Sequence, residues 1–170
     1  MRGVMILGAA LGCMLASANG LAAEVNTDRL APLRALVGEW RGESSAGRTL
    51  RISYRLIAND TVLVESWRSP SGRETMTVYH QDGSDLVATH YCAQGNQPRL
   101  RLGADRRDHR WHFFFRDATN LSTPRASHLH EFWIEPLDAG TMRRSETYTA
   151  DGERSEESAV LKRIVPDPGA

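Results

Sequence analysis

The sequence predicts an all-β fold, in which one antiparallel domain of about ten strands follows a short helix. Many short segments alternate apolar and polar residues with a period of two, as a half-buried strand does. The connections between these segments are mostly of hairpin length, and no rhythm of alternating strands and helices is present. A chain of 170 residues is long enough to bury a sizeable core as one domain. Such a row of strands is typical of an antiparallel barrel or sandwich.

Residues 1–23 predict a secretory signal peptide rather than a part of this domain. Arg2 gives a short positive region, and residues 4–15 (VMILGAALGCML) form an apolar run that is too short to span a membrane. Small residues follow this run, so we expect cleavage after Ala18 or Ala23.

Arginine usage and the leader together indicate a periplasmic or secreted bacterial protein. Of the 21 basic residues, all but Lys162 are arginine, which is typical of a GC-rich bacterial genome. Lipoprotein anchoring through Cys13 is an alternative, because residues 10–13 (ALGC) could form a lipoprotein site with Cys13 as the acceptor. We expect a barrel domain over residues 24–165 and a flexible tail over residues 166–170.

The mature chain is close to neutral and keeps one cysteine. Loss of Arg2 from 21 basic residues leaves 20 against 21 acidic residues, a net charge of about −1. This balance argues against nucleic acid or an anionic membrane as the main partner. With the leader removed, Cys92 has no second cysteine for an intramolecular disulfide. We expect no transmembrane segment in the mature chain, and its oligomeric state is left open.

The helix is predicted over residues 26–38 (NTDRLAPLRALVG), because its leucines recur at helical spacing and Gly38 provides a stop. After Gly38 the period becomes two, and QDGS at 81–84 is a hairpin turn signal. The strands are predicted over residues 39–44, 49–57, 62–68, 73–80, 85–92, 98–102, 109–115, 127–135, 141–149 and 158–164.

The combination of a short helix, the Gly-x-Trp at 38–40 and about ten short strands resembles the calycin-like barrels. These include the lipocalins, the fatty-acid-binding proteins and the ten-stranded nitrobindin-type haem barrels. The resemblance implies a closed barrel in which Trp40 and residues near 27–40 cover one end. It also implies non-enzymatic binding of a small, partly apolar molecule in the lumen.

Two longer segments carry a second resemblance. Residues 79–100 (YHQDGSDLVATHYCAQGNQPRL) and 117–130 (DATNLS…HLH) are similar to a family of small exported bacterial proteins of unknown function. This resemblance implies a fold and a location, but it brings no activity and no site residue.

Two histidine-containing pairs are candidates for a metal or haem site. His90 and Cys92 share one face of a strand, and so do His128 and His130 with Phe132, because side chains two apart point the same way. If both pairs face inward, three imidazoles and a thiol form a Cys-His₃ set that suits zinc. A neutral imidazole could instead hold a haem iron. The structural alternative is a buried cysteine and histidines that bond carbonyls or water.

The haem interpretation needs aromatic walls, for which Tyr54, Trp67, Trp111 and Phe113 are the candidates. The first-strand segment GEWRGESSAG (38–47) is poorer in glycine than the corresponding nitrobindin-type pattern. A cysteine enzyme would need Cys92 beside His128 or His130 as a base, with Asn96 or Asn120 as the orienting group. No family signature supports such an enzyme, so we predict no catalytic residue.

Polar loops and in-phase charges supply the remaining ligand candidates. Asn96 and Arg99 in one loop, and Asn120 in another, could rim a pocket or only shape their loops. On two other strands, Glu65 and Arg144 are in phase with apolar neighbours. They lie either in the lumen, as a paired polar cluster with Glu146, or on a solvated outer face. The fatty-acid-binding resemblance implies that Arg144 could receive a ligand carboxylate.

The sequence therefore predicts an exported barrel that binds a small, partly apolar ligand without catalysis. A metal- or haem-binding barrel is the first alternative, and a ligand-free structural or interaction protein of the envelope is the second. The candidate ligand-binding residues are Tyr54, Glu65, His90, Cys92, Asn96, Arg99, Asn120, His128, His130 and Arg144.

Overall fold

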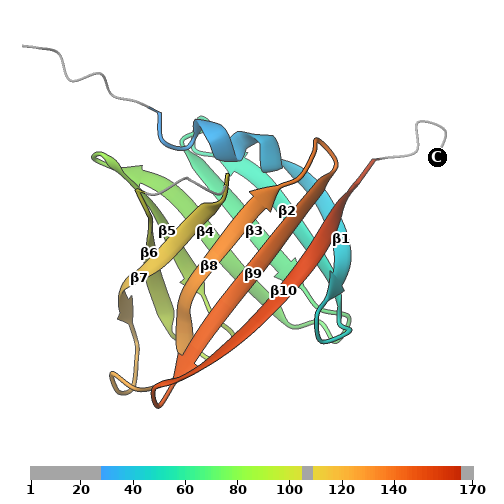
Figure 1. The fold of residues 1–170 in the computed structure, drawn as a ribbon. Helices are drawn as coiled ribbons and strands as arrows, with labels where there is room; N and C mark the ends of the chain where they lie inside the picture. The colour runs from blue at the N-terminus through green and yellow to red at the C-terminus, as the bar shows by residue number, and fades with distance from the viewer. Residues whose placement is uncertain (1–27, 105–108, 166–170) are drawn as a thin grey trace, which may run out of the picture.

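Pairing of each strand with its neighbours in sequence builds an antiparallel barrel, and pairing of β1 with β10 closes it (Figure 1). This computed structural model describes residues 28–104 and 109–165, and these residues contain ten strands. The predicted all-β, ten-stranded antiparallel barrel is confirmed. The predicted signal peptide (1–23) and tail (166–170) lie outside the described residues. Within the described part, no helix has the length and hydropathy that crossing a membrane requires.

The elements follow one another with short connections. A 3-10 helix, η1, covers Ala31–Leu36 and is shorter than the predicted segment 26–38, of which residues 26 and 27 lie outside the described part. The strands are β1 (Gly38–Ser44), β2 (Thr49–Ile57), β3 (Val62–Arg68), β4 (Glu74–Asp82), β5 (Asp85–Tyr91), β6 (Gln97–Leu102), β7 (Trp111–Thr119), β8 (His128–Pro136), β9 (Thr141–Ala150) and β10 (Glu153–Ile164).

Two strands extend by four or five residues beyond their predicted segments at one end. β10 begins at Glu153 rather than at residue 158, and β7 continues to Thr119 beyond residue 115. The five residues added to β10 (153–157) are polar on both faces, because the inner side of β10 meets a solvent-accessible cavity there rather than the core. Ser155 and Glu157 line that cavity. A polar inner face removes the period-two signal from which a strand is recognised.

One end of the barrel is covered by η1 (Figure 1). Leu30, Leu33 and Leu36 are at most 2% exposed and pack into the core. The Trp40 indole Nε1 donates a hydrogen bond of 2.8 Å to the Leu36 carbonyl oxygen. The Arg163 guanidinium lies 4.3 Å from the centre of the Trp40 ring on its other side. These contacts fix η1 across the end of the barrel that the Gly-x-Trp pattern indicated.

Aromatic rings fill the lumen behind η1. Phe113 and Phe132 stack with their centres 4.7 Å apart, and Tyr79 meets them edge-on at 5.6 and 6.1 Å. All three side chains are fully buried. Rings at these separations pack this part of the lumen closely with side chains.

Candidate functional site

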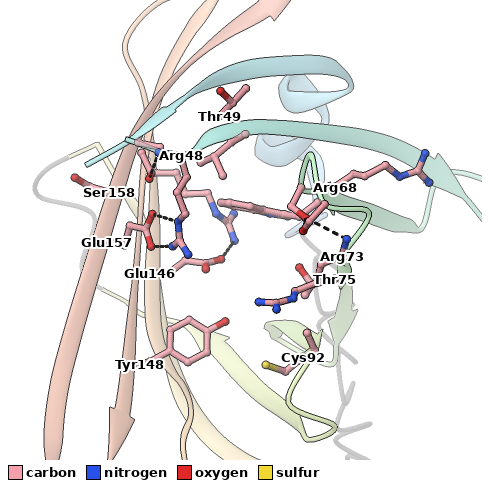
Figure 2. Close-up of a pocket in the computed structure, with 18 of the residues that line it drawn as sticks. Arg48, Thr49, Arg68, Arg73, Thr75, Cys92, Glu146, Tyr148, Glu157 and Ser158 are labelled. Atoms are coloured by element: carbon pink, nitrogen blue, oxygen red, sulfur yellow. Dashed lines mark hydrogen bonds and ion pairs between the residues drawn. The ribbon is translucent and has the colours of Figure 1, made fainter. Parts of the chain in front are cut away.

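A cavity of about 640 Å³ lies in the half of the barrel away from η1 (Figure 2). Its lining comes from the β1–β2, β3–β4 and β5–β6 turns and from inward side chains of β2, β3, β9 and β10. These three turns lie at the end of the barrel opposite η1 (Figure 1). The cavity therefore opens where the chain makes hairpins, and a volume of this order suits a small molecule.

The cavity wall combines apolar, hydroxyl and charged groups. Leu50, Trp67 and Ala159 supply apolar surface, and Tyr148 adds an aromatic ring with a hydroxyl. Serine hydroxyls from the turns and from β10 add further hydrogen-bonding groups. A ligand that fits this wall needs an apolar body with a few polar groups.

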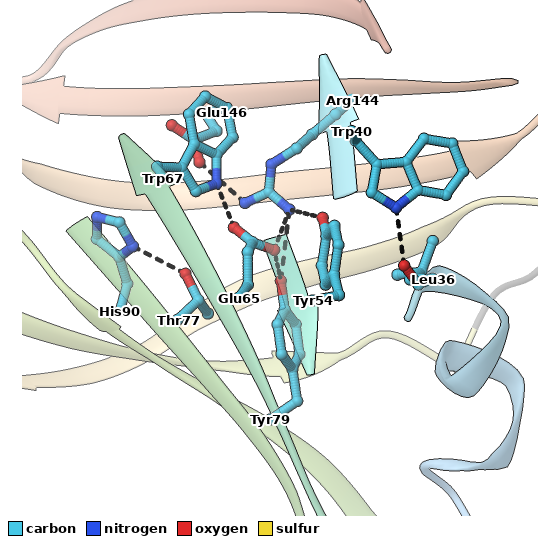
Figure 3. Close-up of polar contacts among 10 residues, drawn as sticks. All are labelled: Leu36, Trp40, Tyr54, Glu65, Trp67, Thr77, Tyr79, His90, Arg144 and Glu146. Carbon is cyan, nitrogen blue, oxygen red and sulfur yellow. Dashed lines mark hydrogen bonds and ion pairs between the residues drawn. The ribbon is translucent and has the colours of Figure 1, made fainter. Parts of the chain in front are cut away.

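Beneath the cavity floor, an arginine and a glutamate form a fully buried ion pair (Figure 3). Arg144 Nη1 donates to Glu65 Oε2 over 2.7 Å, and the two side chains are 1% and 0% exposed. The Tyr79 hydroxyl donates to the same carboxylate oxygen over 2.5 Å. Arg144 Nη1 also lies 3.4 and 3.5 Å from the Tyr79 and Tyr54 hydroxyl oxygens. Of the two sequence alternatives for Glu65 and Arg144, the structure has the buried one.

Two further side chains, Trp67 and Glu146, extend the pair toward the cavity. The Trp67 indole Nε1 donates to Glu65 Oε1, and Arg144 Nη2 donates to Glu146 Oε1 over 2.9 Å. The Trp67 and Phe132 rings lie 5.1 and 4.8 Å from the guanidinium carbon. Arg144 Nε is buried and has no hydrogen-bond partner among the described residues. The arginine is thus surrounded by two carboxylates and two rings before any ligand arrives.

The protonation states of this cluster are held by its burial. Burial, followed by the negative charge of Glu65, raises the pKa values of the Tyr54 and Tyr79 hydroxyls well above their ordinary value. Burial opposes the charge on Arg144, but Glu65, the two tyrosines and Glu146 together outweigh that effect and raise its pKa. Both tyrosines therefore keep their protons and remain hydrogen-bond donors, while Arg144 stays cationic.

His90 and Cys92 both point into the barrel, as their shared phase predicts. His90 is 2% exposed; its Nδ1 is hydrogen-bonded to Thr77 Oγ1 at 3.0 Å and its Nε2 lies 3.4 Å from the Tyr148 hydroxyl. Burial lowers the pKa of His90, although Glu146 partly offsets that effect. Cys92 lines the cavity, and its Sγ accepts a bond from the backbone N–H of Gln94 at 3.5 Å. His90 is thus a neutral, satisfied histidine behind the cavity wall.

The prediction that His128 and His130 share a face with Phe132 is wrong. The register of β8 against β9 shifts between Leu129 and Glu131, and this bulge inserts one residue into the alternation. Leu129 consequently joins Phe132 in the core in place of His130. A period-two pattern contains no signal for such an insertion.

The two histidines instead contact each other beside Phe115. His128 Nδ1 bonds the Ala126 carbonyl oxygen at 2.8 Å, and His130 Nδ1 lies 3.5 Å from His128 Nε2. Their rings lie 4.6 and 5.6 Å from the Phe115 ring. Within residues 28–104 and 109–165, no three His, Cys, Asp or Glu side chains form a group that could hold a metal ion. The structure does not bring the two predicted pairs together.

The haem-wall and loop candidates mostly lie away from the cavity. Of the four aromatic wall candidates, Trp67 lines the cavity, whereas Tyr54, Trp111 and Phe113 belong to the buried core. The three loop candidates make structural contacts instead of lining the cavity. Asn96 Nδ2 bonds the Ser127 carbonyl oxygen at 2.8 Å, Asn120 Nδ2 bonds the Gly95 carbonyl oxygen at 2.6 Å, and Arg99 pairs with Asp117 across β6 and β7.

The mouth of the cavity has charged residues that sequence reasoning missed. Arg48 forms an ion pair with Glu157, and Arg73 also lines the mouth (Figure 2). Arg48 lies in a predicted turn and Arg73 at the first position of a predicted strand, and such positions are ordinarily solvated. A signal was present for Arg48, since it is in phase with the inward Leu50, and for Glu157, which is in phase with Ala159.

We expect Arg144→Met to cost about 3–5 kcal/mol of unfolding free energy, because it leaves the Glu65 carboxylate buried without a cation. The matched change Arg143→Met, on the outer face of β9 in a partly exposed pair with Glu135, is expected to cost about 0–1 kcal/mol. Urea unfolding measures both. The double variant Glu65→Gln with Arg144→Met should recover part of the loss; equal losses for Arg144→Met and Arg143→Met would contradict the ion-pair interpretation.

His90 is expected to make the fold less stable in acid. Its folded pKa lies below the unfolded value of 6.5, so the unfolded chain binds the proton first. The stabilisation is complete above pH 6.5 and is lost as the pH falls through the depressed folded pKa. Urea unfolding at pH 7.5 and 5.0 should show a smaller acid loss for His90→Gln than for the parent chain. An identical loss in both would show that His90 does not contribute.

Comparison with known proteins gives the fold and no more. No family model and no curated protein matches the chain. Among solved structures, Rv2717c from M. tuberculosis is 16% identical, with a TM-score of 0.55 over 80% of this chain and 97% of that one. A protein of unknown function from the DUF3598 family of Nostoc punctiforme PCC 73102 is 17% identical, with a TM-score of 0.51 over 78% of this chain. The match spans about half (49%) of the length of that protein. The chain thus shares its barrel fold with both structures.

Proposed function

We propose that the protein is an exported, non-enzymatic barrel that binds a small, partly apolar molecule in its lumen. The cavity of about 640 Å³ is the observation that carries this proposal. Pockets for small ligands typically enclose about 300–1,000 Å³, so the space is of the right order. A barrel that served only as a structural element of the envelope would have no need to leave half of its lumen open.

The floor of the cavity supports binding because it is already organised. Arg144 is held by Glu65, Glu146 and two tyrosine hydroxyls, so its side chain has no freedom to lose when a ligand arrives. Preorganised walls lower the entropic cost of binding. Above this floor, Trp67 and Tyr148 offer flat surface for an apolar body.

A binding role is favoured over catalysis by the contacts of His90. Its imidazole is bonded to Thr77 and Tyr148, and neither bond involves the Cys92 thiol. A cysteine nucleophile needs a base within hydrogen-bond reach. The one thiol at the cavity therefore lacks the activation that a cysteine enzyme requires.

Filling the cavity should abolish binding. We expect Ala159→Trp, on the cavity wall, to weaken binding of a neutral dansyl sulfonamide by at least about tenfold, since the new ring occupies the ligand's space. Val160→Trp, one residue on and 45% exposed, is the matched control and should leave binding unchanged. Dansyl fluorescence enhancement measures both affinities. Failure of the parent chain to bind, together with native mass spectra free of any small molecule, would refute a ligand-binding lumen.

We also propose export through the leader at residues 1–23. In a bacterial host, the protein is expected in the periplasmic fraction with an N-terminus at Asn19 or Glu24, as read by N-terminal sequencing. Leu11→Arg, which breaks the apolar run, should leave the full chain in the cytoplasm. A cytoplasmic parent chain that begins at Met1 would refute export, and a lipid-blocked N-terminus at Cys13 would replace the cleaved soluble form with a lipoprotein.

A further inference from the structure

We propose that the ligand carries a protonated nitrogen, as an amine or a quaternary ammonium, and that this cation binds beside Glu146 on the cavity floor. This inference rests on the proposed function and adds the charge of the ligand to it. The resemblance to fatty-acid-binding barrels implies the opposite charge, a ligand carboxylate at Arg144. The contacts around Arg144 decide between the two.

The buried cluster has one carboxylate more than it has cations. Arg144 Nη1 is bonded to Glu65 at 2.7 Å and Nη2 to Glu146 at 2.9 Å, so one positive charge serves two negative ones. Glu65 accepts bonds at both oxygens, from Trp67 at one and from Tyr79 and Arg144 at the other. Both oxygens of Glu65 therefore have hydrogen-bond donors, and the uncompensated negative charge lies on Glu146.

Glu146 is also the member of the cluster that a ligand can reach. Its side chain is 16% exposed and lines the cavity, whereas Glu65 is 0% exposed. Oε1 accepts the bond from Arg144, and Oε2 has no hydrogen bond with the residues that the structure describes. Figure 2 shows the Glu146 carboxylate at the floor below Arg48 and Glu157. A free carboxylate oxygen in a partly desolvated place is an acceptor for a charged donor.

Two aromatic side chains line the cavity together with Glu146. Tyr148 follows Glu146 by two residues on β9, and both line the cavity (Figure 2). Trp67 also lines the cavity, and its ring lies 5.1 Å from the guanidinium carbon of Arg144, which is bonded to Glu146 (Figure 3). A carboxylate among aromatic rings is a combination that holds organic cations, since the ring faces add to the charge attraction.

Arg144 is poorly suited to bind an anionic ligand. Each of its terminal nitrogens already donates to a carboxylate, and the Trp67 and Phe132 rings lie close to its guanidinium. Its Nε is buried and has no hydrogen-bond partner among the described residues, and Arg144 is 1% exposed where it lines the cavity. A ligand carboxylate would have to displace Glu65 or Glu146 and leave that group without its partner, which is costly in a buried place.

The other charges at the cavity stand nearer the mouth. Arg48 is neutralised by Glu157, and Arg68 is paired with Glu74. Arg73 has no ion-pair partner among the described residues, and it belongs to the β3–β4 turn at the rim. The cavity is thus negative at its floor and positive at its mouth, and Arg73 is where an anionic ligand would bind if the inference were wrong.

Three matched fluorescent probes test the inference: dansylcadaverine (cation), N-butyl dansylamide (neutral) and 6-(dansylamino)hexanoate (anion). We expect the cation to bind at least about tenfold more tightly than the neutral probe. Glu146→Gln should bring the cation down to the affinity of the neutral probe, whose own binding stays unchanged and so reports an intact cavity. Glu39→Gln, on the outer face of β1 and 47% exposed, makes the same change in net charge and should leave the order of affinities unchanged.

The outcomes separate this inference from the proposed function. Equal binding of all three probes, or tightest binding of the anion with its loss in Arg73→Ala, would overturn the cationic ligand while leaving a binding lumen. A cation preference that survives Glu146→Gln would likewise overturn the role of Glu146. Binding of none of the probes would count against the lumen as a ligand site altogether.

Discussion

The buried ion pair between Arg144 and Glu65 is the interaction on which the barrel interior depends. The two residues stand on β9 and β3, which are separated in the strand order by β10, β1 and β2 on one side, so the pair reaches across the lumen. Neither charge could be buried alone, and their partners Tyr54 and Tyr79 add β2 and β4 to the connection. Four strands are therefore held at a fixed separation by groups that must remain together.

The same pair divides the lumen into two halves with different roles. On the η1 side, Phe113, Phe132 and Trp40 make a packed apolar core. On the other side the wall is rich in serine and arginine, and the barrel is open. Because the pair and its tyrosines occupy the middle, a ligand entering from the mouth meets charged groups before it can reach the apolar half. The depth of the cavity is thus a consequence of where these charges are paired.

Alternation in the sequence is enough to predict the strands and the inward phase of His90 and Cys92, whereas the covered end was implied by the resemblance to calycin-like barrels. It could not decide whether Glu65 and Arg144 faced the lumen or solvent, because one charge on a strand gives no evidence of a partner on another. The bulge that moves His130 out of phase leaves no mark in a period-two pattern. Strand ends with a polar inner face near the mouth are not predicted as strands, because the pattern recognises a strand by the apolar residues that face the core.

The charge that a ligand must carry is determined by the groups around an arginine, rather than by the place of that arginine in a barrel. The fold-level analogy assigns an anion to Arg144, and it would hold if the guanidinium were exposed and unpaired. Here two carboxylates have already taken its terminal nitrogens, and Glu146 keeps one oxygen free at the cavity. Glu65 and Glu146 outnumber the single arginine, and the cationic ligand that we propose supplies the positive charge that the cluster lacks.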